Sequence, residues 1–432
     1  MIAKSLLETV VRDQRQEFAA LGKTVSRTML HSMLAYRGTA ACVVKGVRRC
    51  GKSTLLQQLM AAKYPDDFYY VNFDDERVAD FTKEDFQPLM ETLLEAFGKK
   101  TVIFFDEIQN VRGWELFVNR LLREGNRVFL TGSNAHLLSR ELGTHLTGRH
   151  VDVELFPFSF AEFLRARGDE PRPPWSTAER VRLKKALLDY LDRGGMPEAV
   201  VMENDQLAAQ LLQDIMQKDI LGRVSIRKPA EMRSVLRFLI ANAGNPATVR
   251  SLMNNFGIRS ANTLQKYIAC AEDSYLVFTV RRFDRKIKRL DRSPRKVYCI
   301  DTGMVFRISP GVTERRDALL ENAVAVHLKR LGKEAYYYRG GGETDFVLPR
   351  DRLALQVCTE VTARNKEREL RGLREGMRAI KATRGLILTL DQEETRGKVR
   401  MLPVWRWLLE QEGPQGKGRR PGKRRTPQPG RA

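Results

Sequence analysis

The sequence predicts an α/β protein whose N-terminal part is a mainly parallel β-sheet covered by helices on both faces. Three features lead to this prediction. Short apolar runs alternate with segments of helical period along residues 1–155. A loop of the form G-x-x-x-x-G-K-[ST] follows the first run and precedes a helical stretch. A later run ends in two adjacent carboxylates, Asp106 and Glu107.

Five strands are expected in this sheet. Each is short, rich in β-branched or aromatic residues, and followed by polar residues or glycine. Near-continuous apolar runs are typical of strands buried on both faces, and helices between successive strands favour parallel pairing. The expected strands are residues 40–44, 68–73, 102–105, 127–131 and 151–155.

The glycine-rich loop GVRRCGKST predicts a nucleoside triphosphate site. Its glycines let backbone N–H groups point at phosphates, and the next helix presents its positive N-terminal end. Lys52 is expected to reach the β- and γ-phosphates, and Ser53 to hold Mg²⁺. The expected binding residues of the loop are Gly46, Val47, Arg48, Arg49, Cys50, Gly51, Lys52, Ser53 and Thr54.

The acidic strand end indicates hydrolysis of the bound nucleotide. Asp106 is placed to hold the Mg²⁺ hydration shell, and Glu107 to orient and polarise the attacking water. Carboxylates also occur at strand ends because those ends are solvated, but the complete loop favours the catalytic interpretation. No N-K-x-D or T-K-x-D sequence follows, and residues 365–368 lack the aspartate. ATP is therefore favoured over GTP.

Polar residues after the fourth strand add two candidate roles. Ser133 or Asn134 could sense the γ-phosphate, and a turn-forming role explains them equally well. Arg140 or Arg149 could neutralise the transferred charge, in the same subunit or across an interface, although most arginines are only solvated. Arg149 is the candidate we assign to catalysis.

The composition indicates a polyanionic partner. The net charge is +22 in 432 residues, which favours DNA, RNA or an anionic surface over a neutral partner, unless the source simply favours arginine. The five cysteines show no metal or disulfide spacing, as expected for a reduced cytoplasmic protein. No apolar run approaches the roughly 18 residues that span a bilayer, and the amphipathic N-terminus does not resemble a signal peptide.

Two helical units are expected after the sheet. Residues 156–222 have helical period at 158–165 and 179–193, which predicts a lid behind the nucleotide site. Between the helices of the lid lies the turn GGMP at residues 194–197. Its backbone could approach the base or ribose of the nucleotide closely, or the turn could serve only to end a helix.

The second unit, residues 223–305, has the element order of a winged helix. Helices are expected at 231–242, 248–255 and 260–273, and strands at 276–280 and 296–300. Such a module either contacts double-stranded DNA or packs beside the ATPase. The segment expected to contact phosphate contains Arg281, Arg282, Arg285, Lys286, Lys288, Arg289, Arg292, Arg295 and Lys296.

Residues 306–411 are expected to form a nuclease-like α/β unit that has lost its chemistry. A helix at 316–331, a strand pair within 335–349 and a strand at 353–357 place Glu321 and Asp345 as metal ligands. Gln356 and Cys358 replace the expected glutamate and lysine, which weakens metal binding. Lys366 is the remaining candidate ammonium group. Residues 412–432 form a basic tail expected to be disordered.

Taken in order, these motifs resemble a family of prokaryotic AAA+-type ATPases over about residues 20–410. The resemblance depends on GVRRCGKST, FFDEIQ, FLTGSN, LTGRH with LFPFSFAEF, GGMPEAV, and LEN with ETDFV and QVC. It implies a P-loop ATPase with strand order 5-1-4-3-2, a winged helix, and a C-terminal domain related to restriction endonucleases. It also implies that Lys52, Ser53, Asp106 and Glu107 have the roles given above.

Three functions remain open at this point. The leading hypothesis is an ATP-hydrolysing switch that changes its hold on DNA or on another partner, including a protein. The second is a nucleic-acid-binding regulator that holds ATP with little turnover. The third is an ATP-gated, metal-dependent nuclease. An oligomer is compatible with all three.

Overall fold

The computed structural model describes residues 1–20, 22, 24–133, 146, 148–222, 226–285, 293–308 and 316–412. Its N-terminal sheet is parallel throughout and has the order β2-β3-β4-β1-β5. This is the implied order 5-1-4-3-2 read from the other edge, so that prediction is confirmed. The strands are β1 (Ala41–Lys45), β2 (Tyr69–Asn72), β3 (Val102–Asp106), β4 (Arg127–Gly132) and β5 (His150–Glu154).

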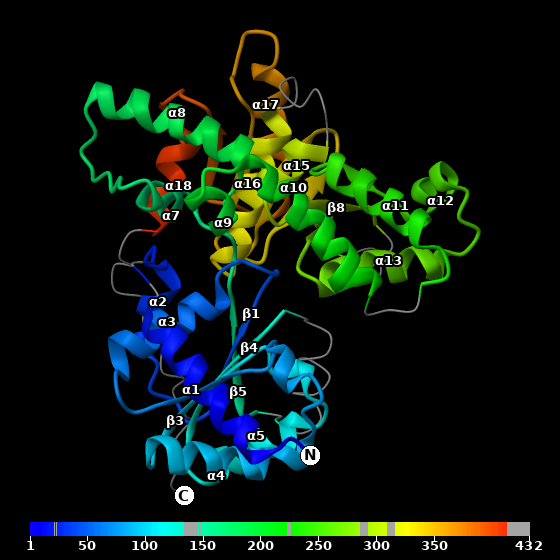
Figure 1. Cartoon of the computed structure of the whole chain (residues 1–432). Coiled ribbons are helices and arrows are strands. Elements are labelled where there is room, and N and C mark those ends of the chain that lie inside the picture. The colour runs from blue at the N-terminus through cyan, green and yellow to red at the C-terminus, as the bar shows by residue number, and fades with distance from the viewer. Residues whose placement is uncertain are drawn as a thin grey trace, which may run out of the picture.

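Helices cover both faces of this sheet (Figure 1). Alternate residues of β1 point to opposite faces, so Val43 packs with one group of helices and Val44 with the other. The first group is α1 (Lys4–Ala20), α4 (Phe86–Phe97) and α5 (Trp114–Arg123). The second group is α2 (Thr28–Ala35) and α3 (Lys52–Lys63).

The helical lid region begins directly after β5. Its helices are α7 (Phe160–Ala166), α8 (Thr177–Arg193), α9 (Pro197–Val201), α10 (Asp205–Asp214) and a π-helical segment (Ile215–Leu221). Ser159 and Ser176 cap α7 and α8, and a glutamate three residues later completes each capping box. The sequence predicted α7 and α8, but not the shorter helices that follow.

The next unit consists of three helices and a small antiparallel sheet of order β6-β8-β7. The five expected elements lie within two residues of their expected bounds, whereas β6 was not expected. The elements are α11 (Pro229–Ala241), β6 (Pro246–Ala247), α12 (Val249–Phe256), α13 (Ala261–Asp273), β7 (Val277–Arg281) and β8 (Arg295–Cys299).

The C-terminal unit is built around a mixed sheet of order β13-β14-β12-β11-β10-β9. The strands are β9 (Tyr336–Arg339), β10 (Glu343–Leu348), β11 (Leu353–Val357), β12 (Arg384–Thr389), β13 (Glu394–Arg396) and β14 (Val399–Pro403). The helices are α15 (Thr302–Ile308), α16 (Arg316–Arg330), α17 (Lys366–Ala379) and α18 (Val404–Glu412). Three of the six strands were expected; β12 to β14 and α17 were not.

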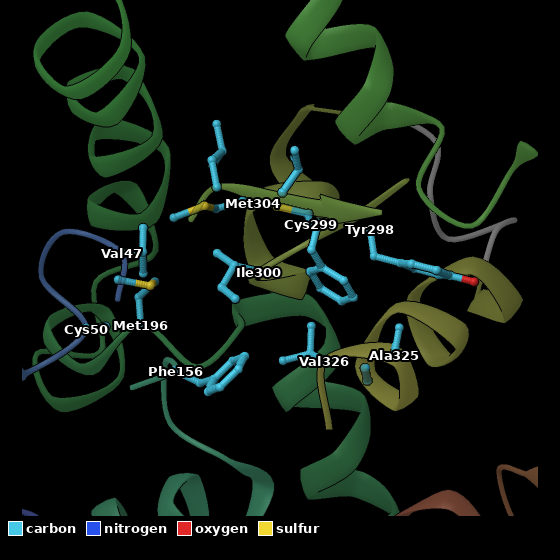
Figure 2. Packing of buried hydrophobic residues seen from close by; sticks show 14 of the residues in the cluster. Val47, Cys50, Phe156, Met196, Tyr298, Cys299, Ile300, Met304, Ala325 and Val326 are labelled. Carbon is cyan, nitrogen blue, oxygen red and sulfur yellow. The ribbon is translucent and has the colours of Figure 1, made fainter. Parts of the chain in front are cut away.

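One hydrophobic core runs from the glycine-rich loop to the C-terminal unit. Figure 2 shows Ile300, just after β8, between Cys50 and Met196 on one side and Val326 of α16 on the other. The same cluster includes residues of α3, α8, α11, α13 and α18. The units expected after residue 155 therefore share buried surface with the N-terminal sheet. Among the described helices, none combines the length and hydropathy needed to cross a membrane.

Candidate functional site

The glycine-rich loop joins β1 to α3 at the carboxyl end of the sheet. A side chain at Gly46 would place its Cβ 2.2 Å from the Leu155 carbonyl oxygen, so only glycine fits there. Gly51, with φ of +92°, is left-handed, and a Cβ there would lie 3.0 Å from Arg27 Nη1. Both glycines are thus required by the turn that directs the loop into the N-terminus of α3.

Asp106 lies at the end of β3 and is almost fully buried. Its carboxylate accepts hydrogen bonds from the hydroxyls of Thr131 on β4, Tyr70 on β2 and Ser53 on α3. Burial, together with the neighbouring Glu107, raises the pKa of Asp106. Three adjacent elements therefore fix this carboxylate beside Ser53, the arrangement expected of two groups that share a magnesium ion.

Lys52 and Glu107 form an ion pair beside Asp106, with Nζ 3.4 Å from Oε1. Burial alone would raise the pKa of Glu107, but the Lys52 ammonium and a hydrogen bond from Gln109 hold that pKa below its usual value. Ser133 also donates to Glu107, at 3.2 Å. Glu107 is therefore an ionised carboxylate, and Ser133 contacts it directly; Asn134 and Arg140 lie outside the described residues.

An open hollow of about 730 Å³ lies over these groups. Arg48, Arg49, Gly51, Lys52, Ser53, Thr54, Asp106 and Glu107 line it. Val25, Pro197 and Met202 form an apolar part of the wall, and Met202 is 65% exposed. Val47 and Cys50 are fully buried in the core, so only their backbone can face a phosphate. A phosphate cradle beside an apolar wall matches the chemistry of a nucleotide.

The two loop arginines are bound to the helical region. Arg48 donates to Asp219 in the π-helical segment, with Nε 2.9 Å from Oδ2. Arg49 pairs with Glu198 of α9 at 3.0 Å. The turn before α9 is itself buried: Gly195 N–H donates to Asp301 Oδ2 at 2.6 Å. The loop is thus tied by ion pairs to two separate parts of the lid region.

Arg27 is a residue of this site that the sequence did not reveal. It is 3% exposed, and its guanidinium donates to the Cys50 carbonyl oxygen at 2.7 Å, to Phe156 O at 2.6 Å, and to Glu162 Oε1 at 3.0 Å. Glu162 Oε2 lies 3.4 Å from Nη1 of Arg330 on α16. Glu162 falls in the motif LFPFSFAEF, but no local pattern marks Arg27 or Arg330 as its partners.

Arg149 lies away from the site within one chain. It immediately precedes β5, where its neighbour His150 pairs with Ala41 at the start of β1. The glycine-rich loop follows the other end of β1, about 16 Å away for five residues at 3.3 Å each. Arg149 is exposed and donates to Asn119. The same-subunit catalytic role is therefore wrong, and a role across an interface stays a prediction.

A second buried ionic cluster lies in the C-terminal unit. Lys296 of β8 is 1% exposed, and its Nζ lies 2.9 Å from Glu321, 2.8 Å from Glu343 and 3.3 Å from Asp345. Tyr298 donates to the same Glu321 oxygen as Lys296, at 2.6 Å. The expected pair Glu321 and Asp345 is thus brought together, with an ammonium group at its centre.

The other residues of the nuclease-like pattern do not complete a reactive site. Gln356 donates to buried Glu369 at 2.8 Å. Burial raises the pKa of the Cys358 thiol to about 12, so this side chain is a neutral core residue. Lys366 begins α17, and Lys296 is the ammonium beside Asp345. Within the described ranges, no group of three or more His, Cys, Asp or Glu side chains is arranged to hold a metal ion.

The described part of the basic segment packs against the C-terminal unit. Lys296 is buried, so the expectation that it contacts phosphate is wrong. Arg282 donates to the Arg339 carbonyl oxygen, and Arg285 to that of Ala379 at 3.0 Å. Phe283 N–H donates to Tyr337 O of β9 at 2.7 Å. Lys286, Lys288, Arg289 and Arg292 lie outside the described residues.

Comparison with known proteins identifies two regions of the chain. A family model described as an AAA domain matches residues 39–164, and a domain of unknown function, DUF8612, matches residues 184–312. The first region contains all of the P-loop residues as well as Asp106 and Glu107. The second contains most of the lid region and the three-helix unit.

Two relatives match along most of their length. The chain is 31% identical to the uncharacterized protein MJ1544 of Methanocaldococcus jannaschii, over 94% of this chain and 96% of that protein. It is 29% identical to an uncharacterized protein of Haemophilus influenzae, over 85% and 94%. A solved structure, a point mutant of Thermotoga maritima RuvB, is similar with a TM-score of 0.28 and 15% identity, covering 69% of this chain and 96% of that one. Its overall shape is too different to inform function. The chain belongs to the family of the Methanocaldococcus protein, and its residues 39–164 match the AAA domain, with a complete P-loop.

Proposed function

We propose that this protein hydrolyses ATP with Mg²⁺ and that its nucleotide state controls its hold on double-stranded DNA. The observation that supports the enzymatic part is the convergence of Lys52 and Ser53, at the start of α3, with Asp106 and Glu107, at the end of β3, at one open hollow. None of these contacts follows from chain proximity alone, since Lys52 and Glu107 are fifty-five residues apart. If Asp106 and Glu107 were only solvated residues at a strand end, contacts with Lys52 and Ser53 would not be expected.

The roles of the residues follow from their positions. The backbone of Gly46 to Thr54 and the ammonium of Lys52 bind the phosphates at the N-terminus of α3. Ser53 and Asp106 would hold Mg²⁺, which neutralises phosphate charge when bound. Glu107, kept ionised by Lys52, orients and polarises the attacking water. Val25, Pro197 and Met202 give the base an apolar surface.

The loop contacts also support a switch. Arg48 and Arg49 are paired with Asp219 and Glu198, and phosphates compete directly with those carboxylates for the two guanidinium groups. Binding of ATP would therefore weaken two ties between the loop and the lid region. Because the lid region shares a core with α11, α13 and α16, a change in the lid reaches the units beyond it.

Phosphate release from ATP tests the enzymatic proposal. We expect Glu107→Gln to abolish turnover while retaining binding of a fluorescent ATP analogue, because the amide cannot accept a proton from water. Glu91→Gln, the same change on the exposed face of α4, should leave turnover intact. Equal turnover in wild type and Glu107→Gln would remove Glu107 from the mechanism. Tight binding without turnover in wild type would favour the regulator.

DNA enters the same assay as a second variable. If duplex DNA is the partner, its addition should change the turnover rate of wild type, and its affinity should differ between ATP and ADP. An unchanged rate and equal affinities would remove DNA from the proposal and leave the ATPase standing. The net charge of +22 is the observation that favours a polyanion.

A nuclease is the less supported alternative. The ammonium of Lys296 occupies the space between the carboxylates that a metal would need. Supercoiled plasmid incubated with Mg²⁺ or Mn²⁺ should therefore remain supercoiled. Nicking that disappears in Asp345→Ala would overturn this conclusion.

Arg149 would act only across an interface. Arg149 is exposed, as an arginine contributed across an interface must be. In that case Arg149→Ala should lower turnover, and turnover per chain in wild type should rise with protein concentration. Concentration-independent turnover in wild type, unaffected by Arg149→Ala, would exclude the role.

A further inference from the structure

The α12–α13 pair has the short, glycine-containing connection of a helix-turn-helix. The helices are separated by four residues, 257–260, and Gly257 adopts a left-handed conformation with φ of +64°. Figure 1 shows α11, α12 and α13 projecting from the side of the molecule. In such pairs the second helix enters a groove of duplex DNA.

The exposed face of α13 is polar and suited to base edges. Leu264 and Tyr267 face the core, whereas Asn262, Gln265 and Lys266 are exposed. Asparagine and glutamine amides can pair with the adenine edge in the major groove. The solvent-facing side of α13 therefore carries amide groups of the kind that such readout uses.

A basic hollow of about 740 Å³ adjoins the start of α13. Arg227, Lys228, Arg259 and Lys266 line it, together with the hydroxyl groups of Ser260 and Thr263. The one carboxylate of the lining, Glu231, is 3.1 Å from Lys228 and also accepts from the Tyr267 hydroxyl. After that pairing, the lining retains three positive charges. An anion of backbone phosphate chemistry is the complementary ligand.

Basic residues of β7, of β8 and of the described part of the segment between them are the alternative phosphate-binding groups of this unit. Lys296 is buried and forms ion pairs with three carboxylates. Arg282 and Arg285 donate hydrogen bonds to carbonyl groups of the C-terminal unit. Exposed arginines of the unit outside the hollow are Arg237, Arg250, Arg281 and Arg285, but Arg227, Lys228, Arg259 and Lys266 are the cations that line one hollow beside α13.

We infer that α13 reads double-stranded DNA and that the basic hollow beside it binds the DNA backbone. This inference rests on the proposed association with DNA and names the surface responsible. Asn262 and Gln265 contact bases, while Arg227, Arg259 and Lys266 contact phosphates. Acidic protein segments would match the charge, but they would lack the paired donor and acceptor of an adenine edge that an amide binds bidentately.

The test is fluorescence anisotropy of a labelled duplex of about 30 base pairs with the full-length chain, between about 50 and 200 mM KCl. Arg259→Glu with Lys266→Glu changes two exposed side chains, and the fold should tolerate both. We expect at least roughly tenfold weaker binding and a salt dependence lower by about two counterions. The control, Arg364→Glu with Lys398→Glu, makes the same charge change on exposed residues of the C-terminal unit.

Three outcomes would overturn the inference. The first is equal loss of affinity in the two double variants, which would indicate a general charge effect. The second is absence of duplex binding by wild type, with turnover of ATP still intact in the same preparation. The third is competition by polyglutamate as strong as by unlabelled duplex, which would favour an acidic protein partner.

Base reading is tested separately from phosphate binding. Asn262→Ala with Gln265→Ala should leave the salt dependence unchanged and reduce discrimination among sequences in a pool of random duplexes. An unchanged sequence preference, with the affinity of wild type, would restrict the site to phosphate contact and overturn the proposed role of these amides.

Discussion

Arg27 and Glu162 form a buried ion pair, 3.0 Å apart, directly behind the glycine-rich loop. The pair links the glycine-rich loop to α16 of the C-terminal unit. Arg27 donates to the loop carbonyl of Cys50, and Glu162 also pairs with Arg330 of α16. The position of the phosphate-binding backbone therefore depends on Arg330, a residue of the C-terminal unit.

Glu162→Gln should be strongly destabilising. It leaves the guanidinium of Arg27 buried without its carboxylate, a change that costs about 3–5 kcal/mol in other proteins. The exposed pair of Glu170 with Arg165 provides the control, because Glu170→Gln should cost less than about 1 kcal/mol. Urea unfolding of both variants measures the difference. Equal stability of the two variants would contradict the importance of the buried pair.

Arg330→Met should raise the KM for ATP without touching the nucleotide pocket. The expected cause is a looser hold of Arg27 on the loop, so kcat should change less than KM. Combined with Arg27→Met, the effects should be less than additive, since both act through Glu162. Lys333→Met, which removes a pair with Asp351 at 2.6 Å on the surface, should leave KM unchanged. Additive effects of the two arginine variants would rule out the network.

Acid should destabilise the protein partly through His327. Burial lowers the pKa of His327 to about 3 from 6.5, and Arg330 acts in the same direction. Between these values the unfolded chain binds a proton that the folded chain does not, so stability falls as pH falls below about 6.5. At pH 5 the difference of about 1.5 units corresponds to about 2 kcal/mol.

His327→Gln should remove this part of the pH dependence, as seen in unfolding midpoints at about pH 7.5 and pH 5. The exposed His31 provides the control, and His31→Gln should leave the wild-type slope in place. An unchanged slope in His327→Gln would assign the acid sensitivity to other groups.

Lys296→Met should destabilise the C-terminal unit by about 3–5 kcal/mol, because it leaves Glu321, Glu343 and Asp345 without their shared cation. Adding Glu321→Gln should recover part of the loss by removing one of the charges. Lys398→Met, on the surface, should have little effect. Thermal unfolding of the four proteins, wild type included, would show whether the single variant is the least stable, and a neutral Lys296→Met would contradict the prediction.

Much of the fold follows from local patterns. The strands of the N-terminal sheet are continuous apolar runs. The motif Gly46 to Thr54 lies in the sequence between one such run and a segment of helical period, which predicts a loop between a strand and a helix. The elements of the three-helix unit are bounded by polar capping residues such as Thr248 and Ser260. Such signals are short in range, and a single sequence contains them.

The contacts between distant residues could not be read in the same way. Lys296 ends a run of basic residues in the sequence, and only the fold brings three carboxylates around it. Arg27 lies in a segment with no regular pattern, and its partners are 23, 129 and 135 residues away. Arg149 was assigned by its motif, whereas the parallel register of β5 with β1 decides which end of the sheet it occupies.

The buried turn at Gly195 has a consequence for synthesis of the chain. Its N–H donates to Asp301, and the wall residue Pro197 lies two positions further on. The P-loop leaves the ribosome early in synthesis. Asp301, which accepts the hydrogen bond from the turn before Pro197, is made more than a hundred residues after that turn. A nascent chain can therefore form this contact behind the pocket wall only after residue 301 has left the ribosome.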